Sequence, residues 1–272
     1  MKTLKEHIME GLKISANTKI NTHNYHPNTN DELKELVIEL IKERGKDADL
    51  NDIDVSGISD MSYVFDHSDF DGDISMWDVS NVENMLSMFY KSKFNGDISK
   101  WNVSNVENMR SMFMNSEFNG DISKWNVGNV KNMGYMFYGS KFNGDISEWD
   151  VSNVKIMYDM FYDSKFNEDI SKWDVSKVED MNSMFYFSKF TGDISKWNVS
   201  NVKDMSYMFS SSVFNNDISG WDVSNVENME NMFYDSKFKG DISKWDVSKV
   251  KNMDSIFDRS SLKNNPPKWY KR

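Results

Sequence analysis

Apolar and polar positions along this chain follow a pattern that returns every 24 residues. The tryptophans mark this period, and the sequence holds no tryptophan outside it: Trp77, Trp101, Trp125, Trp149, Trp173, Trp197, Trp221, Trp245 and Trp269. A fixed period of a few tens of residues indicates one supersecondary unit that is copied and stacked. Because one unit cannot bury its apolar side alone, we expect neighbouring copies to share a continuous core that contains these tryptophans.

Within one copy the apolar spacing changes its period. Residues 98–103 read I-x-x-W-x-V, which predicts a short strand whose inward residues alternate at its end. Residues 104–107 read S-x-x-E, a capping box, and the apolar residues of 106–113 then recur at i, i+3, i+6 and i+7. This predicts a short helix, and Asn119-Gly120 after it predicts a turn that tolerates positive φ.

The copies define the extent of the array. Full copies begin at Phe70, Phe94, Phe118, Phe142, Phe166, Phe190, Phe214 and Phe238. A degenerate copy precedes them, and a truncated copy begins at Leu262. We therefore expect an α/β, leucine-rich-repeat-like solenoid of strand–short helix repeats over residues 53–261. Its parallel strand ladder, with strands about 4.8 Å apart, would give a rod on the order of 40 Å long.

Both ends of the chain depart from the repeat. Residues 30–44 read N-D-E-L-K-E-L-V-I-E-L-I-K-E-R, an amphipathic pattern that predicts a helical N-terminal cap within residues 29–52. Residues 1–28 predict a weaker helix followed by a polar linker, as either a docking or sorting element or an additional cap. Pro266-Pro267 breaks the pattern, so residues 262–272 are expected to form a C-terminal cap in which Trp269 closes the core.

Composition and charge exclude several classes of binding partner. The net charge of -11 argues against nucleic acid, and the absence of cysteine excludes disulfides and thiolate metal sites. No apolar run approaches a membrane span and no secretory signal is visible, so we expect no membrane insertion. A cytoplasmic or virion-associated location follows unless export uses a non-standard route.

The charges are unevenly placed along the array. Nine aspartates and no lysine or arginine lie between Asp47 and Asp73, whereas the C-terminal stretch is basic. The basic residues there are Arg259, Lys263, Lys268, Lys271 and Arg272. Opposite charge at the two ends would permit head-to-tail self-association, although solvated end caps are the plainer interpretation.

Residues with catalytic or metal-binding chemistry have a structural explanation in the repeat. The methionine pair of each copy, such as Met85 and Met88, fits core filling better than a copper site. The aspartate before each I-x-x-W segment fits turn hydrogen bonds better than calcium binding. His23 and His26 fit a solvated pair better than a metal site. No phosphate loop, zinc-hydrolase motif or nucleophile elbow occurs, so we expect neither an enzyme nor a cofactor.

The positions whose residues differ between copies lie mainly on the predicted helical side. Five outward tyrosines and one phenylalanine outside the repeat register fall in copies three to five, and we predict that they form a contact patch. They are Tyr135, Tyr138, Tyr158, Tyr162, Tyr186 and Phe187. The plainer alternative is that the rings pack along the outside of the stack with wet hydroxyls.

The string W-D-V-S-N-V-x-x-M-x-x-M-F, in 77–89 and again in 221–233, resembles the BspA-like leucine-rich-repeat family. The resemblance covers residues 47–257. It implies a right-handed α/β solenoid and a non-enzymatic binding role, since members are commonly bacterial surface proteins implicated in adhesion, and related arrays occur in phage genomes. This sequence shows no signal peptide, lipidation cysteine or anchor, so we do not expect it to be displayed on a surface by itself.

Three functions remain open from the sequence. The first is a repeat scaffold for protein–protein interaction or adhesion, with a protein partner that the sequence does not name. The second is a structural or virion-associated phage protein docked through its N-terminal arm. The third is a glycan-binding adhesin that uses the strand ladder and the exposed tyrosines.

Overall fold

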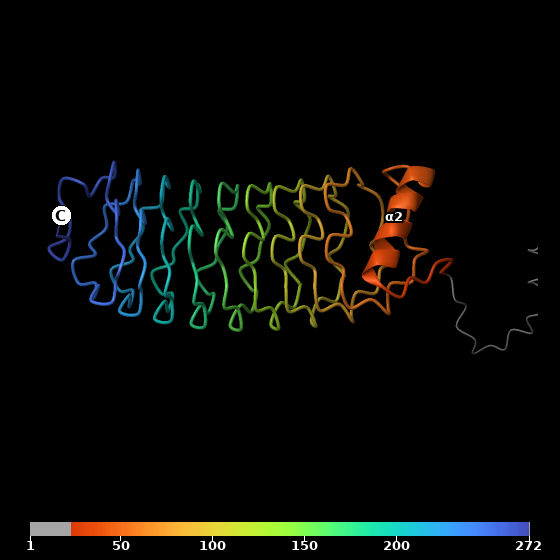
Figure 1. Ribbon diagram of the computed structural model, residues 1–272, viewed down its shortest axis with the longest axis horizontal. Coiled ribbons are helices and arrows are strands. Elements are labelled where there is room, and N and C mark those ends of the chain that lie inside the picture. Colours follow the sequence, from red (N-terminus) through yellow and green to blue (C-terminus); the bar gives the residue numbers. More distant parts are fainter. Residues whose placement is uncertain (1–22, 272) are drawn as a thin grey trace, which may run out of the picture.

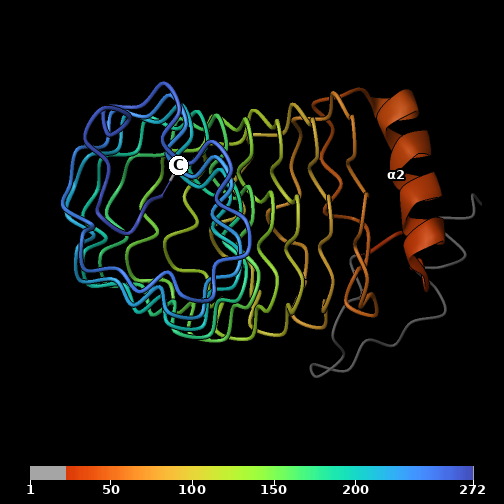
Figure 2. The ribbon, with the colours of Figure 1, turned by 60° about the vertical axis from the view of Figure 1, so that its left-hand side comes forward.

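Successive 24-residue copies stack along one axis, so that each copy makes one coil of a solenoid (Figure 1). The structure is a computed structural model and describes residues 23–271. Seen more nearly end-on, the coils form closed loops around a common interior (Figure 2). The repeat solenoid predicted from the 24-residue period is therefore confirmed, and the secondary structure inside each coil differs from the prediction.

Among the described residues, the one α-helix is α2, which spans Asn30–Arg44 as the amphipathic pattern predicts. The Thr29 side chain accepts a hydrogen bond from the Glu32 N–H at 3.2 Å and so caps the first turn of α2. The buried face carries Leu33, Val37 and Leu40. The helix lies across the end of the orange coils and covers the first coil (Figure 2).

Backbone hydrogen bonds join the coils in the segment where a helix is predicted. The N–H groups of Met85, Ser87 and Phe89 donate to carbonyls of the next coil, each at 2.9 Å. One parallel bridge per coil accompanies them, as between Asn84 and Asn108. Since alternate N–H groups point to the next coil, this segment is the ladder that holds the stack together.

The prediction of a short helix in each copy was wrong. Met88 N–H donates to the Met85 carbonyl and Ser92 N–H to the Phe89 carbonyl, both at 3.2 Å, so two turns follow one another. Ser87 (φ 53°) lies in the left-handed region, and so does the third residue of the second turn. An isolated helix of this length is unstable, whereas the turns release alternate N–H groups for bonds between coils.

The prediction of a capping box was also wrong, because turns take the place of the helix that it would begin. Ser104 N–H donates to the Asn102 side-chain oxygen at 3.2 Å, which makes a local turn. Glu107 N–H donates to the Glu83 carbonyl of the previous coil at 2.8 Å.

The predicted I-x-x-W-x-V strand is also a pair of turns. Trp101 N–H donates to the Ile98 carbonyl at 3.1 Å, and Val106 N–H to the Val103 carbonyl at 3.0 Å. The link between coils comes here from a side chain, because the Trp101 indole N–H donates to the Ile74 carbonyl of the previous coil at 3.2 Å. The parallel ladder therefore exists, but in the methionine-phenylalanine segment.

Columns of identical aromatic rings fill the core. The rings of Phe94 and Phe118 lie 6.3 Å apart and parallel, and those of Trp77 and Trp101 lie 6.4 Å apart at 1°. The methionine pairs of the full copies are buried from Met85 to Met232, as core filling requires. The tryptophans are buried from Trp77 to Trp245, so the predicted tryptophan core is found everywhere except at the C-terminal end.

Glycine in the Asn119-Gly120 turn has a different role from the predicted one. The φ of Gly120 is not positive, and a Cβ atom there would lie 2.8 Å from the Phe118 ring. Gly120 is therefore needed for the close approach of a core ring. Seventeen non-glycine residues of the described chain adopt positive φ instead, in the turns of the ladder.

The two ends of the solenoid are closed unequally. Trp269 is half-buried, and its indole N–H donates to the Ile242 carbonyl at 2.8 Å. At the other end the backbone of the predicted linker joins the start of the solenoid, since Tyr25 pairs with Ile53 in a parallel bridge. The predicted N-terminal helix falls within residues 1–22, outside the described residues.

Candidate functional site: an aromatic patch on coils three to five

The turns of the ladder bring outward residues of successive coils into columns parallel to the solenoid axis. The six aromatic residues predicted as a contact patch come together on this face, where they form the aromatic patch. Its members are Tyr135 and Tyr138 of coil three, Tyr158 and Tyr162 of coil four, and Tyr186 and Phe187 of coil five.

One half of the aromatic patch is a column of rings. Tyr138 and Tyr162 stack with their centroids 4.3 Å apart, and Tyr162 meets Tyr186 edge-on at 4.8 Å. Tyr186 in turn stacks on Phe187 at 4.5 Å. Phe187 is 49% exposed, whereas the tyrosines are half-buried, so the column ends in one open apolar ring.

The other half of the patch packs under a cation. Tyr135 and Tyr158 meet edge-on at 5.0 Å, and the Arg110 guanidinium lies 5.7 Å from both ring centroids. Such cation–π contacts hold both rings in place. Tyr135 also lies 5.8 Å from Tyr138, which joins the two halves into one surface.

A buried carboxyl group lies beneath this half. Asp159 is 9% exposed, and burial raises its pKa to about 6, although a hydrogen bond with Tyr135 acts in the opposite direction. Nearby Asp180 adds to the increase and is itself raised in pKa by burial. Burial also raises the pKa of Tyr135, and the charge of Asp159 contributes to that shift. The carboxyl group thus anchors a patch ring from below.

The structure adds Tyr207 of coil six, which the sequence analysis missed. Its ring lies 5.8 Å from that of Tyr186, and its hydroxyl donates to Glu230 at 2.9 Å. Tyr207 stands in the same repeat position as Tyr135, three copies later. This shared position was the signal that could have found it.

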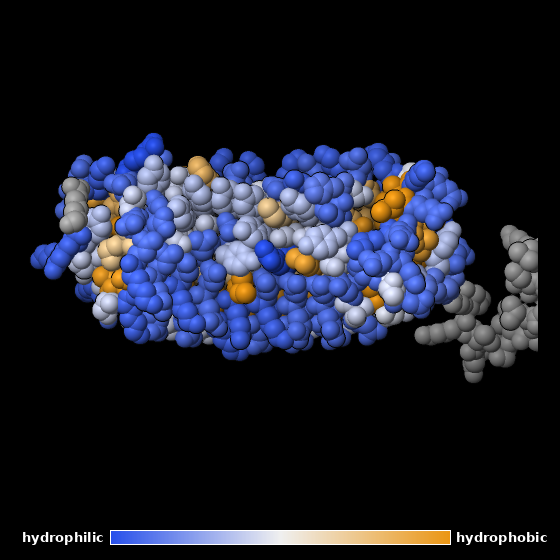
Figure 3. Space-filling view, in the orientation of Figure 1, coloured by the Kyte–Doolittle hydropathy of each residue, from blue (hydrophilic) through white to orange (hydrophobic). Residues whose placement is uncertain are grey.

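Charged residues line the margin of the patch. Lys165 and Lys189 occupy the same exposed position in coils four and five, directly after the tyrosine column. Elsewhere, lysines pair with glutamates of the adjacent coil, as Lys131 does with Glu107 at 2.6 Å. Exposed pairs of this kind contribute little to stability. Figure 3 shows pale and orange atoms gathered along the middle of one mainly hydrophilic face.

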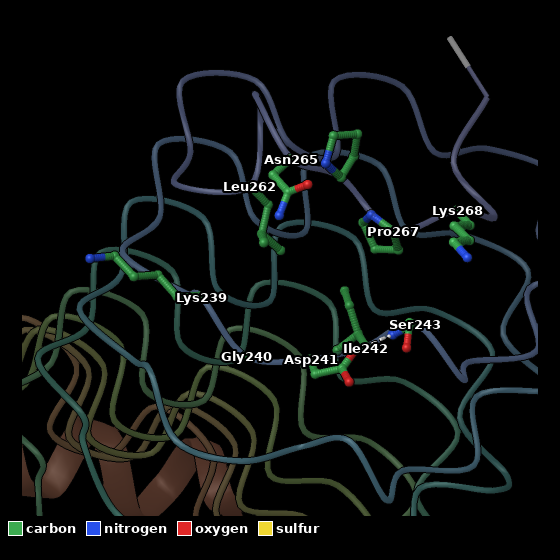
Figure 4. A pocket seen from close by; sticks show the side chains of 10 residues that line it. Lys239, Gly240, Asp241, Ile242, Ser243, Leu262, Asn265, Pro267 and Lys268 are labelled. Carbon is green, nitrogen blue, oxygen red and sulfur yellow. Dashed lines mark hydrogen bonds between the residues drawn. The ribbon is translucent and has the colours of Figure 1, made fainter.

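A separate pocket lies near the C-terminal end, between the last full copy and residues 262–268 (Figure 4). Leu262 and Pro267 line one part of it, and Asp241 and Ser243 another. The Asp241 carboxylate accepts a hydrogen bond from Ser243 N–H at 2.9 Å, which lowers the pKa of Asp241. The carboxylate is therefore engaged in a turn.

The aspartates of the other copies behave in the same way. Asp97 accepts from Ser99 N–H at 2.9 Å, and hydrogen bonds from Ser99 lower its pKa. Within residues 23–271 no group of three or more His, Cys, Asp or Glu side chains is arranged to hold a metal ion. His26 lies 3.2 Å from the Asp54 carboxylate.

Stacked coils with continuous aromatic columns define a repeat-solenoid protein. The chain belongs to the family described as "Mycoplasma protein of unknown function, DUF285", whose model matches residues 35–141, 115–212 and 164–269. Neither a search of curated proteins nor a search of solved structures gave a match. No helix in the described part of the chain is long and apolar enough to cross a membrane.

Proposed function

We propose that this protein is a non-enzymatic repeat scaffold for protein–protein interaction or adhesion, which contacts its partner through the aromatic patch. The observation that carries the proposal is the continuity of the patch, whose rings touch from Tyr135 to Phe187 across three coils. Aromatic and arginine side chains dominate binding energy at protein interfaces, and Arg110 lies against two of these rings.

The surface outside the aromatic patch favours the patch as the contact site, because that surface is nearly the same in every coil. Most exposed positions carry the same polar residues in every coil, and their charges pair between coils, as in Lys203 with Glu179 at 2.7 Å. The patch interrupts that regularity. The resemblance to BspA-like leucine-rich-repeat proteins is part of the same proposal, since it implies an adhesive role and no catalysis.

Head-to-tail stacking through the ladder does not suit the N-terminal end. The Asn30 side-chain amide at the start of α2 donates to the carbonyls of Asp60 and Ser62, at 3.0 and 3.1 Å. These acceptors of the first coil are therefore already used. The alternative of a virion-associated protein docked by its arm depends on residues 1–22, outside the part that the structure describes.

The test is an affinity pull-down from host and source-organism lysates with two baits. One bait is the intact chain, and the other carries Tyr138, Tyr162, Tyr186 and Phe187 changed to Ser. A partner retained by the intact chain and lost by the variant is the expected result. Because the three tyrosines are half-buried and stacked, we expect the variant to unfold at a lower urea concentration, and circular dichroism checks that both baits are folded under the pull-down conditions.

A control bait carries Tyr63→Ser, because Tyr63 is 44% exposed and lies outside the patch, in the degenerate copy that precedes coil one. This bait should capture the same partner as the intact chain. Recovery of one and the same partner by all three baits would place the contact elsewhere and refute the proposal.

A further inference from the structure

The hydrogen-bond ladder of the array has a direction. In its methionine-phenylalanine segment, the alternate N–H groups of each coil donate to carbonyls of the coil that follows. Coil seven does so toward coil eight, where the N–H groups of Met229 and Asn231 donate to the carbonyls of Asn252 and Asp254, at 2.8 and 2.9 Å. In this segment the side of a coil that faces the C-terminal end therefore presents donors, and the opposite side presents acceptors.

The N–H groups of coil eight that would continue this ladder are unpaired. Ser255 (φ 53°) and Arg259 (φ 56°) lie in the left-handed region, as their counterparts in coil seven do, so the backbone follows the same path. The N–H groups of Met253, Ser255, Phe257 and Arg259 have no acceptor among residues 23–271. N–H groups that such turns align to one side are suited to bind oxygen acceptors.

An apolar strip lies uncovered beside these donors. Val247, Val250 and Met253 are only half-buried, whereas their counterparts 24 residues earlier are at most 1% exposed. The C-terminal cap covers another part of coil eight, since the Phe257 ring is 2% exposed and meets the Tyr270 ring edge-on at 5.2 Å. The cap therefore leaves an open edge, which consists of the apolar strip and the N–H row within residues 247–259.

A second copy of this chain does not fit the open edge. Two open edges would bring N–H donors against N–H donors over most of their length. At the N-terminal end the matching acceptors are the carbonyls of Asp60 and Ser62, and the Asn30 side-chain amide already donates to both, at 3.0 and 3.1 Å. The occupant must bring free backbone carbonyls, which the described ends of a second copy do not offer.

The inner coils show which chemistry covers an edge of this kind. Each is covered by the V-x-x-V-x-x-M segment of the next coil, whose apolar side chains are buried and whose following carbonyls accept from the N–H row.

Charge has little part in covering the open edge. Residues 246–259 carry three cationic and three acidic side chains, so they balance. Two of the cations are already engaged with coil seven, since Lys251 pairs with Glu227 and Lys249 donates to Asn225, both at 2.6 Å. Recognition at the open edge therefore depends on the backbone and on apolar side chains.

We propose that the open edge is a docking site for an extended segment of a partner protein, which adds to the ladder as a further parallel strand. The segment carries apolar side chains at the V-x-x-V-x-x-M spacing over Val247, Val250 and Met253, and its carbonyls accept from the N–H groups of Met253 and Ser255. In strand addition, main-chain hydrogen bonds give affinity and side-chain positions give specificity. This inference goes beyond the proposed function, because it assigns a second surface and a different mode of binding.

The probe is a synthetic peptide with the sequence of residues 199–211, V-S-N-V-K-D-M-S-Y-M-F-S-S, which has no net charge and covers coil five inside the array. A matched peptide has serine at both valines and at the first methionine. In isothermal titration of the full chain, the apolar peptide should bind at least about tenfold more tightly than the serine peptide. Added salt should change its affinity by less than about twofold, because no net charge is involved. Equal affinity for the two peptides, or no binding of either, would overturn the proposal.

Amide hydrogen exchange, followed by NMR, locates the bound peptide. Without the peptide, the N–H groups of Met253 and Ser255 should exchange rapidly, whereas those of Met229 and Asn231 should be protected. Saturating peptide should slow exchange at Met253 and Ser255 at least about tenfold. Unchanged exchange at these two residues would refute strand addition at the open edge. Protection that rises with protein concentration in the absence of peptide would identify a second copy as the occupant and would also refute the proposal.

A pair of variants tests the apolar strip. Val250→Lys places a charge where the strip meets the peptide, so it should weaken peptide binding at least about tenfold. Ile38→Lys is the matched control, because Ile38 is 66% exposed on α2, at the opposite end of the solenoid. It should bind the peptide as the intact chain does. Undiminished binding by Val250→Lys would contradict the proposal, and the comparison of the two peptides on the intact chain remains decisive if this variant is poorly folded.

The open edge and the aromatic patch can be tested separately. The chain with Tyr138, Tyr162, Tyr186 and Phe187 changed to Ser should bind the peptide as the intact chain does. Capture of a lysate partner through the aromatic patch, without peptide binding, would leave the scaffold function intact and remove the docking site. Peptide binding at the open edge, with the same lysate partner recovered by every bait, would do the reverse.

Discussion

Removing a tryptophan from the middle of the array should cost far more stability than removing the last one. Trp173 is buried, and its ring stacks on Trp197 at 6.4 Å and packs against Phe161 at 6.3 Å. Its indole N–H donates to the Ile146 carbonyl of the previous coil at 3.0 Å. The Trp173→Ala change thus opens a cavity between coils and removes one of the two hydrogen bonds that the Ile146 carbonyl accepts, since Trp149 N–H still donates to it at 3.2 Å.

The magnitudes follow from these contacts. Cavity formation at a buried tryptophan costs about 3–5 kcal/mol, and the lost indole hydrogen bond adds about 1 kcal/mol. Trp269 is half-buried and contacts Phe257 at 5.8 Å, with no further coil beyond it among the described residues. Because Trp269 buries less surface and has no coil on its far side, Trp269→Ala should cost only about 1–3 kcal/mol.

The assay is urea unfolding followed by far-UV circular dichroism, with the free energy of unfolding extrapolated from the transition. A chain weakened in the middle can also unfold in two steps, since each coil contacts only its neighbours. Trp173→Phe is the control, because it keeps a ring between the coils and should recover part of the loss. Equal losses for the two alanine variants would refute the reasoning that stacking on both sides sets the cost.

Two further predictions concern the patch. Burial raises the pKa of Asp159 to about 6, so the folded state holds the carboxyl proton more tightly than the unfolded chain does. The contribution of Asp159 to stability therefore falls as pH rises from about 4 to about 6. Asp159→Asn should therefore gain up to about 3 kcal/mol at pH 7.5 and almost nothing at pH 4 in urea unfolding, and an equal gain at both pH values would contradict the assignment. Gly134→Ala should lose about 1–2 kcal/mol, because the new Cβ would lie 2.8 Å from the Tyr158 ring. Gly220→Ala, with no heavy atom within 4 Å, should be neutral in the same urea assay, and similar losses for both variants would count against the packing at Gly134.

Much of the aromatic patch follows from the sequence, because residues 24 apart must lie side by side in a stack. That argument places Tyr138, Tyr162 and Tyr186 in one column without any coordinates. The repeat spacing does not predict that Asp159 is buried beneath the patch, since a carboxylate at a variable position is normally expected to be exposed to solvent.

The sequence by itself determined the period, the residues that share the core and the range of α2, because these depend on the spacing of apolar side chains and on local capping. The path of the backbone within each coil was decided only by the tertiary structure. Apolar residues at i, i+3 and i+4 suit a short helix, and they equally suit two consecutive turns. Stacking favours the turns, because they direct alternate N–H groups to the next coil and so extend one hydrogen-bond ladder through the array. The residues that this path places in the left-handed region are mostly not glycine, as Ser87 illustrates. Their residue types therefore do not predict the positive φ.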